Sequence, residues 1–329
     1  MSLNKNCEEL ILLYNLIMFL KSFGLVSGAV GQIFILGAIG YLLVKKNILT
    51  RQGMDVLSRL VIEITLPAMI FTQLIQNFKF SLSPAWWIFP LCSFAITFLG
   101  FLIGGIFVNL IKQEEEKGQF LSLVAFQNSG YLPLALVAAL LTPEEVSLMF
   151  IYIFLFLLGF NLIMWSFGVY FLSYQRNKRF ELASFFSPPV LATIITMALV
   201  GLGLNRFIPE VILKPLRMVG DSTLPLAMFV VGGSLGLIQI RRVEFKPVIL
   251  LILAKLLILP LLGLLFIRQF RLSWLFSLLL IMQLAMPSAT SLSLIITHYK
   301  REDLLISQGV LFTHLVSLIS IPLFLSLVF

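Results

Sequence analysis

Long apolar runs fill most of this chain, and only short charged or turn-rich connectors separate them. Each run is long enough to cross the hydrocarbon core of a bilayer, which takes about 20 helical residues. Only 12% of the residues are charged, whereas a soluble domain carries about 25%. The sequence therefore predicts an all-α integral membrane protein with ten transmembrane helices. The predicted spans are residues 25–44, 57–75, 84–111, 118–141, 146–175, 182–205, 213–240, 247–267, 272–297 and 304–329.

The first 24 residues form a separate segment in this interpretation. The apolar stretch 10–20 is too short to span a bilayer, and Lys21 follows it directly. We expect residues 1–24 to form a short interfacial helix, with a cleaved signal peptide as the alternative.

The basic residues indicate the orientation of the chain in the membrane. Thirteen Lys and Arg residues fall in connectors on one side of the predicted spans and seven on the other. Because basic loops stay in the cytoplasm, we expect both termini outside and a prokaryotic inner (plasma) membrane location. The basic residues are scattered, which argues against nucleic acid as a partner, and the spacing of Cys7 and Cys92 indicates no metal site.

The chain repeats itself at a shift of 158 residues. Residues 59–67, with Arg59, Glu63 and Thr-Leu-Pro, align without a gap on residues 217–225, with Arg217, Asp221 and Thr-Leu-Pro. Residues 25–175 and 182–329 then form two five-helix repeats of inverted orientation, because each contains an odd number of spans. Inverted repeats are typical of secondary transporters, whose site lies near the midplane where the repeats meet.

Spans four and nine each contain a break near the predicted middle of the membrane. Proline removes a backbone donor from a helix and glycine permits unwinding, so we expect two broken helices that cross. Their half-helix N-termini favour a carboxylate. The expected binding residues are Asn128, Ser129, Gly130, Pro133, Pro287, Ser288, Ala289 and Thr290. Two ordinary proline kinks are the alternative.

Several ionisable residues lie within the predicted spans. Placing a charged side chain in the bilayer costs free energy, so such residues are candidates for a functional role. Two pairs with a spacing of four, Arg59–Glu63 and Arg217–Asp221, can each form an ion pair on one helix face. Lys255 and His314 stand alone in spans eight and ten. All six are candidates for gating or proton coupling, and internal ion pairing or helix packing is the structural alternative.

Three motifs carry a resemblance to the auxin efflux carrier family. They are Thr-Leu-Pro-Ala-Met-Ile-Phe in span two, Asn-Ser-Gly-Tyr-Leu-Pro at residues 128–133, and Met-Pro-Ser-Ala-Thr at residues 286–290. The sequence 298–303 and the tail 320–322 support it, and the resemblance extends over about 25–329. The connector between the repeats is short, as in a compact prokaryotic member.

The resemblance implies a rigid scaffold of spans one, two, six and seven and a moving transport unit of spans three to five and eight to ten. It also implies an anion bound at the crossing of spans four and nine, with Asn128 at the family's asparagine.

Repeat, breaks and resemblance together predict a transporter of a small organic anion, not an enzyme, that works by an elevator-type alternating-access mechanism. It would need no cofactor. The sequence does not distinguish H⁺ from Na⁺ as a coupling ion, and it leaves a homodimeric state open. A sodium-coupled carrier similar to bile-acid symporters and a non-transporting anion sensor are the alternatives. An intramembrane aspartyl protease is disfavoured, because each candidate acid has an arginine four residues away.

Overall fold

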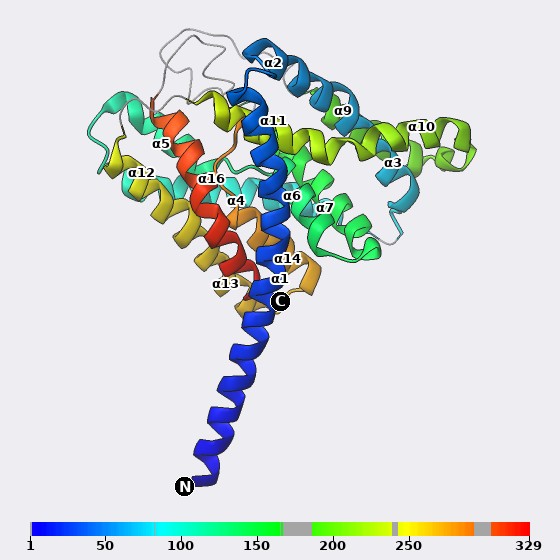
Figure 1. Ribbon diagram of the computed structural model, residues 1–329. Coiled ribbons are helices and arrows are strands. Elements are labelled where there is room, and N and C mark those ends of the chain that lie inside the picture. Colours follow the sequence, from blue (N-terminus) through cyan, green and yellow to red (C-terminus); the bar gives the residue numbers. More distant parts are fainter. Residues whose placement is uncertain (1, 82, 165, 167–185, 239–242, 293–303) are drawn as a thin grey trace.

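Helices joined by short connectors make up most of the residues that the structure describes (Figure 1). The computed structural model describes residues 2–81, 83–164, 166, 186–238, 243–292 and 304–329, with side chains from residue 13 onward except at 115. Residues 167–185, which contain the predicted end of span five and start of span six, lie outside the described part. The predicted end of span nine and the motif at residues 298–303 lie outside it as well. The helices, in chain order, are α1 (Ser2–Lys45), α2 (Arg51–Leu60), η1 (Val61–Thr65), α3 (Leu66–Asn77), α4 (Ile88–Val108), α5 (Glu114–Ala125), α6 (Tyr131–Leu140), α7 (Pro143–Ile163), α9 (Pro188–Gly201), η4 (Leu204–Phe207), α10 (Glu210–Asp221), α11 (Thr223–Leu237), α12 (Phe245–Ile252), η5 (Leu253–Ile258), α13 (Leu259–Phe270), α14 (Trp274–Ala285) and α16 (Leu304–Leu325).

Six of the described helical segments are long and apolar enough to cross a membrane. They are Leu13–Lys45, Ile88–Val108, Pro143–Ile163, Glu210–Leu237, Phe245–Phe270 and Leu304–Leu325. Three shorter apolar helices, α6, α9 and α14, are also present. Many large apolar side chains of the long helices are exposed, as lipid-facing surfaces require; Ile35, Phe98 and Ile319 are examples. These features make the chain an integral membrane protein.

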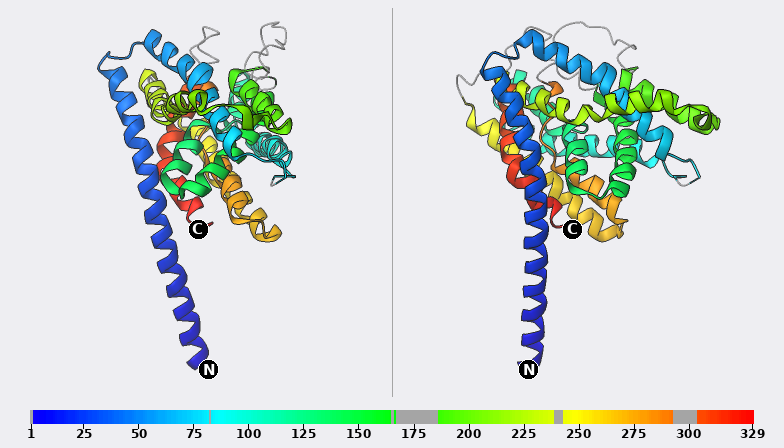
Figure 2. Two further views of the ribbon diagram at one scale, coloured as in Figure 1. Left: turned by 90° about the vertical axis from the view of Figure 1, so that its right-hand side faces the viewer. Right: turned by 45° about the vertical axis from the view of Figure 1, so that its right-hand side comes forward.

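Helix α1 is a single continuous helix, which differs from the expected separation at residue 24. Lys21 and Gly24 both lie within it, and neither interrupts its helical course. At about 1.5 Å per residue its 44 residues extend about 66 Å, roughly twice the thickness of a hydrocarbon core. Its N-terminal part projects away from the other helices in every view (Figures 1 and 2).

The helices pack in two groups that mix the two halves of the sequence, and α1 of the first group also contacts α6 and α16 of the second. In the first group α1 packs along α11, and α3 packs against α9 and α10. In the second, α4 packs against α5 and α7, while α12, α13, α14 and α16 pack against one another. Helix α16 also contacts α5, and α6 contacts α7.

Glycine permits the closest contact in the first group, between α1 and α11. A side-chain carbon at Gly232 would collide with the backbone carbonyl of Gly37, and one at Gly40 would collide with the backbone of Phe229. The two helix axes therefore approach until backbone meets backbone, which only residues without a side chain allow.

Candidate functional site

The helical course of the predicted fourth span is broken between α5 and α6. Helix α5 ends at Ala125, and Phe126 is extended with φ −99° and ψ 113°. Helix α6 begins at Tyr131, so five residues separate the two half-helices. Pro133 lies in the first turn of α6, where backbone N–H groups have no helical partner, so this proline starts the second half-helix without costing a bond.

Glycine is not what makes this break possible. Gly130 has a negative φ of −108°, and a side-chain carbon there would meet Leu157 only at an ordinary contact distance of 3.7 Å. The unwound backbone is instead paired with a second segment.

That second segment follows α14, which ends at Ala285. The two extended stretches run antiparallel, with a bridge between Gln127 and Ser288. The backbone N–H of Asn128 donates to the carbonyl of Pro287 at 2.8 Å, and that of Ala289 donates to the carbonyl of Phe126 at 3.0 Å. The structure thus brings together two predicted breaks that lie far apart in the sequence. We call residues 126–130 with 286–290 the crossing.

Side chains tie the crossing to its neighbours. The Ser288 hydroxyl donates to the carbonyl of Leu123 at 2.7 Å, near the end of α5. The Ser288 backbone N–H donates to the Thr313 hydroxyl of α16 at 3.2 Å. The side-chain amide of Gln283, on α14, donates to the carbonyl of Ser129 at 3.1 Å. Half-helices from both parts of the chain therefore fix one another's ends.

The crossing is buried and rich in polar atoms without hydrogen-bond partners. Asn128, Ser129, Ser288 and Thr290 are each at most 5% exposed. Both side-chain polar atoms of Gln127, Nδ2 of Asn128 and Oε1 of Gln283 have no protein partner. Most buried polar groups are paired, so this unpaired set makes the crossing the candidate site.

Two of these amides were missed by the sequence interpretation. Gln127 directly precedes the expected binding residue Asn128, and Gln283 lies two residues before the end of α14. A glutamine inside an otherwise apolar helical run was the signal available, since α14 contains just one other polar residue, Ser277.

The six ionisable candidates are dispersed. Arg59 Nε donates to Glu63 Oε1 at 3.0 Å, and the two side chains are 75% and 47% exposed, so this ion pair is not buried within the protein. Arg217 and Asp221 form no ion pair, and Asp221 ends α10. His314 is buried on α16, with Nδ1 at 2.8 Å from the carbonyl of Val310.

Lys255 is buried, and its partner is a backbone carbonyl. Its Nζ donates to the carbonyl of Val124 at 2.7 Å, in the last turn of α5. Neither Asp221 nor Glu63 is its partner. The lysine sits in η5, a π-helical turn within the predicted eighth span.

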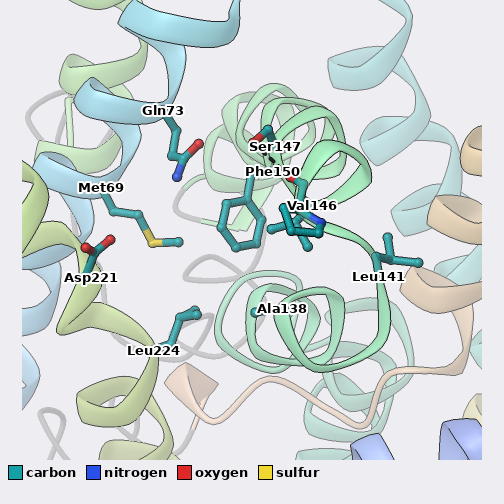
Figure 3. A pocket seen from close by; sticks show the side chains of 10 residues that line it. Met69, Gln73, Ala138, Leu141, Val146, Ser147, Phe150, Asp221 and Leu224 are labelled. Carbon is teal, nitrogen blue, oxygen red and sulfur yellow. Dashed lines mark hydrogen bonds between the residues drawn. The ribbon is translucent and has the colours of Figure 1, made fainter.

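A cleft of about 480 Å³ lies between the two groups of helices (Figure 3). Helices α3, α6, α7 and α10 form its walls. The residues that line it are Met69, Gln73, Ala138, Leu141, Pro143, Val146, Ser147, Phe150, Asp221 and Leu224. The side chains of Met69, Gln73 and Asp221 face those of α6 and α7 across it. No residue of the crossing lines the cleft, yet α6 forms part of its wall and begins at the crossing.

The sequence profile of the family described as "Membrane transport protein" matches residues 25–325. The chain belongs to this family. The match covers nearly every helix described above and confirms the expected relation to auxin efflux carrier-like proteins.

Three relatives show how far the similarity reaches. The chain is 26% identical to the uncharacterized transporter MJ1031 of Methanocaldococcus jannaschii over 302 residues, which cover 88% of this chain and 95% of that protein. It is 31% identical to protein PIN-LIKES 6 of Arabidopsis thaliana over 114 residues, 34% of this chain and 26% of the relative. Protein PIN-LIKES 2 is 32% identical over 111 residues, 33% of this chain and 24% of the relative. The matched parts thus span about a quarter of each plant protein.

Proposed function

We propose that this membrane transport protein carries a small organic anion, a carboxylate, and that the anion binds at the crossing. The observation that carries the proposal is the set of unpaired amides buried there. Gln127 Nε2 and Asn128 Nδ2 are donors without acceptors, and a carboxylate is an acceptor at both oxygens. The crossing, residues 126–130 and 286–290, contains no acidic residue that would repel it.

Helix termini add to the preference for an anion. Helix α6 begins at the crossing and has no side-chain cap at its N-terminus, so its free N–H groups and partial positive charge face the site. Such an end is a ready anion-binding position. In secondary transporters with inverted repeats, broken helices use this arrangement for substrate carboxylates.

Ten membrane crossings in two inverted repeats are part of this proposal. The 158-residue shift that aligns Arg59 with Arg217 also places the first break against the second. In Figure 1, α2 and α5 lie at the side of the molecule opposite the C-terminus. The basic connectors before them, with Lys45, Lys46, Arg51 and Lys112, would face the cytoplasm and leave both termini outside.

Movement of the two helix groups relative to each other is the proposed mechanism. The first group, α1–α3 with α9–α11, corresponds to the expected scaffold, and the second contains both halves of the crossing. The cleft separates α3 and Asp221 from α6 and α7, so it lies where such groups would slide. Because the crossing is closed to this cleft, substrate access requires a rearrangement of the elevator type, with the second group moving as a unit.

Uptake by proteoliposomes containing the purified chain tests the proposal. A panel of labelled monocarboxylates, dicarboxylates and aromatic carboxylates is offered, with labelled organic cations as the comparison. The proposal predicts saturable uptake of at least one carboxylate and none of the cations. Binding of a carboxylate without uptake would favour an anion sensor, and uptake of a cation alone would contradict the proposal.

A further inference from the structure

The C-terminal end of α5 places backbone carbonyls that lack partners in the helix inside the fold. The last four carbonyls of a helix have no helical partner, and together they carry a partial negative charge of about half an elementary unit. In α5 this end lies against the crossing, away from water. Leu123 receives the Ser288 hydroxyl and Val124 receives the Lys255 ammonium.

Among the residues that the structure describes, no carboxylate forms an ion pair with Lys255. The helices packed against η5 are α4, α5, α12, α13, α14 and α16. The described carboxylates at their ends, those of Glu114, Glu116 and Glu244, are at least eight residues along the chain from the contact, or about 12 Å at helical rise. The titratable side chain that is buried on α16 is His314, which carries no negative charge. A lysine that is 1% exposed is thus bonded, within the described residues, to the backbone carbonyl of Val124.

The repeat does not require a cation at this place. The shift of 158 carries Lys255 onto Thr97 of α4, a buried threonine whose hydroxyl has no partner. The aligned position therefore holds a neutral residue in one repeat and a lysine in the other. Since an unpaired buried charge is costly, the lysine has a role beyond packing.

Half-helix C-termini are the places where inverted-repeat transporters hold a coupling cation. We infer that the Lys255 ammonium is a built-in cation that occupies this position at the end of α5 and makes a diffusible sodium ion unnecessary there. The inference rests on the proposed function and narrows it, because it assigns the carrier to a sodium-independent class. The ammonium bonded to Val124 also keeps the last turn of α5 in place beside the bound anion.

Removal of the lysine should convert the position into a site for a free cation. In Lys255→Ala the carbonyl of Val124 faces the space left by the side chain, and a sodium ion can enter it. In Lys255→Met an apolar side chain of similar length fills that space and offers no charge. The two variants therefore separate loss of charge from loss of volume.

Thermal unfolding of the purified full chain tests the inference without any need for transport. The midpoint is measured in sodium chloride and in choline chloride at equal ionic strength. The wild type should unfold at the same temperature in both salts. Lys255→Ala should be less stable in choline and regain stability saturably with sodium, as a ligand of the folded state causes. Lys255→Met should not respond to sodium.

Two results would overturn the inference. One is saturable stabilisation of the wild type by sodium, and the other is a Lys255→Ala protein that sodium leaves unchanged. If Lys255→Ala yields no folded protein in choline, purification in sodium should restore it, and Lys255→Ser, whose hydroxyl adds a ligand, should respond likewise. If neither Lys255→Ala nor Lys255→Ser yields folded protein in sodium, the inference is also overturned. Because uptake is measured separately, absence of carboxylate flux would refute the proposed function and leave this assay informative.

Discussion

The backbone N–H of Asn128 donates a hydrogen bond to the carbonyl of Pro287 at 2.8 Å, which joins the two breaks of the chain directly. This bond belongs to the backbone, so it survives replacement of the Asn128 side chain. It shows why the crossing can hold an unpaired side-chain amide without losing its shape. Structure and ligand binding are therefore separable by mutation at this position.

Ser288→Ala tests whether side chains hold the crossing together. The substitution removes the hydroxyl that donates to the carbonyl of Leu123 and leaves that buried carbonyl unpaired. The expected loss of stability is about 1–3 kcal/mol, seen as a lower midpoint of thermal unfolding in detergent. Ser317→Ala is the comparison, because its hydroxyl bonds only to the carbonyl of His314 on its own helix. Equal small effects of both would contradict a structural role of Ser288 in the crossing.

Gln283→Met tests the glutamine that the sequence interpretation missed. Its side-chain N–H group positions the carbonyl of Ser129, and its Oε1 is unpaired. Methionine removes the stabilising hydrogen bond to Ser129 and also the destabilising unpaired Oε1. These two effects nearly offset each other, so we expect the free energy of unfolding to change by about 1 kcal/mol or less. The KM for carboxylate uptake should rise several-fold. Gln52→Met, at an exposed position of α2, should leave KM unchanged, and an unchanged KM in Gln283→Met would refute the positioning role.

Gly232→Ala tests the close contact between α1 and α11. The added carbon would collide with the backbone of Gly37, and backbone cannot move aside as a flexible side chain can. Overpacking of this kind costs about 1–3 kcal/mol or more, so folded protein should fall sharply in size-exclusion chromatography. Gly105→Ala, where a side-chain carbon meets nothing within 4 Å, should keep or improve the yield because alanine favours helix. A normal yield of Gly232→Ala would contradict the described packing.

The carboxylates of Glu116 and Glu244 predict a pH dependence outside the membrane-spanning segments. Burial, followed by the nearby charge of Glu244 and a hydrogen bond with it, raises the pKa of Glu116 above its ordinary value of 4.5. A raised carboxyl pKa means that the folded state prefers the protonated form, so stability is lost as pH rises through the folded pKa. Glu114 pairs with Lys117 on the same helix, and Gln308 accepts the backbone N–H of Glu244.

Glu116→Gln mimics the protonated form and should therefore raise the thermal midpoint at neutral pH. Its advantage over the wild type should shrink as pH falls toward 4.5, where the wild type becomes protonated. Glu114→Gln, which loses the ion pair with Lys117, should show no such gain. A lower midpoint of Glu116→Gln at neutral pH would show that the two carboxylates do not oppose each other.

The sequence predicted much of the fold because hydrophobic length is a strong signal. Apolar runs located the helices, and prolines with polar residues located both breaks around Asn128 and Ser288. The continuity of α1 was missed because Lys21 and Gly24 are common interruptions in sequence, although neither breaks a helix by itself. The π-helical turns around Glu63 and Lys255 left no pattern that a periodicity of 3.6 residues could reveal.

The site was predictable only in part, for a physical reason. The residues of the crossing followed from helix-breaking chemistry, which is local in the sequence. Contacts such as Lys255 with Val124, or Gln283 with Ser129, join segments more than a hundred residues apart. The ion pair expected between Arg217 and Asp221 is not formed, since a spacing of four permits a pair without requiring one. Such details are decided by tertiary packing.

Counterflow exchange of a labelled carboxylate in proteoliposomes tests the central claim most directly, with Asn128→Ala compared with Asn109→Ala. Asn128 Nδ2 is buried and unpaired, whereas Asn109 is an exposed residue at the end of α4. The account predicts that Asn128→Ala loses about tenfold or more in exchange, the effect of removing about 1.4 kcal/mol of ligand binding, while its unfolding midpoint stays within about a degree of the wild type. Asn109→Ala should exchange normally. Full exchange by Asn128→Ala would contradict an anion site at the crossing.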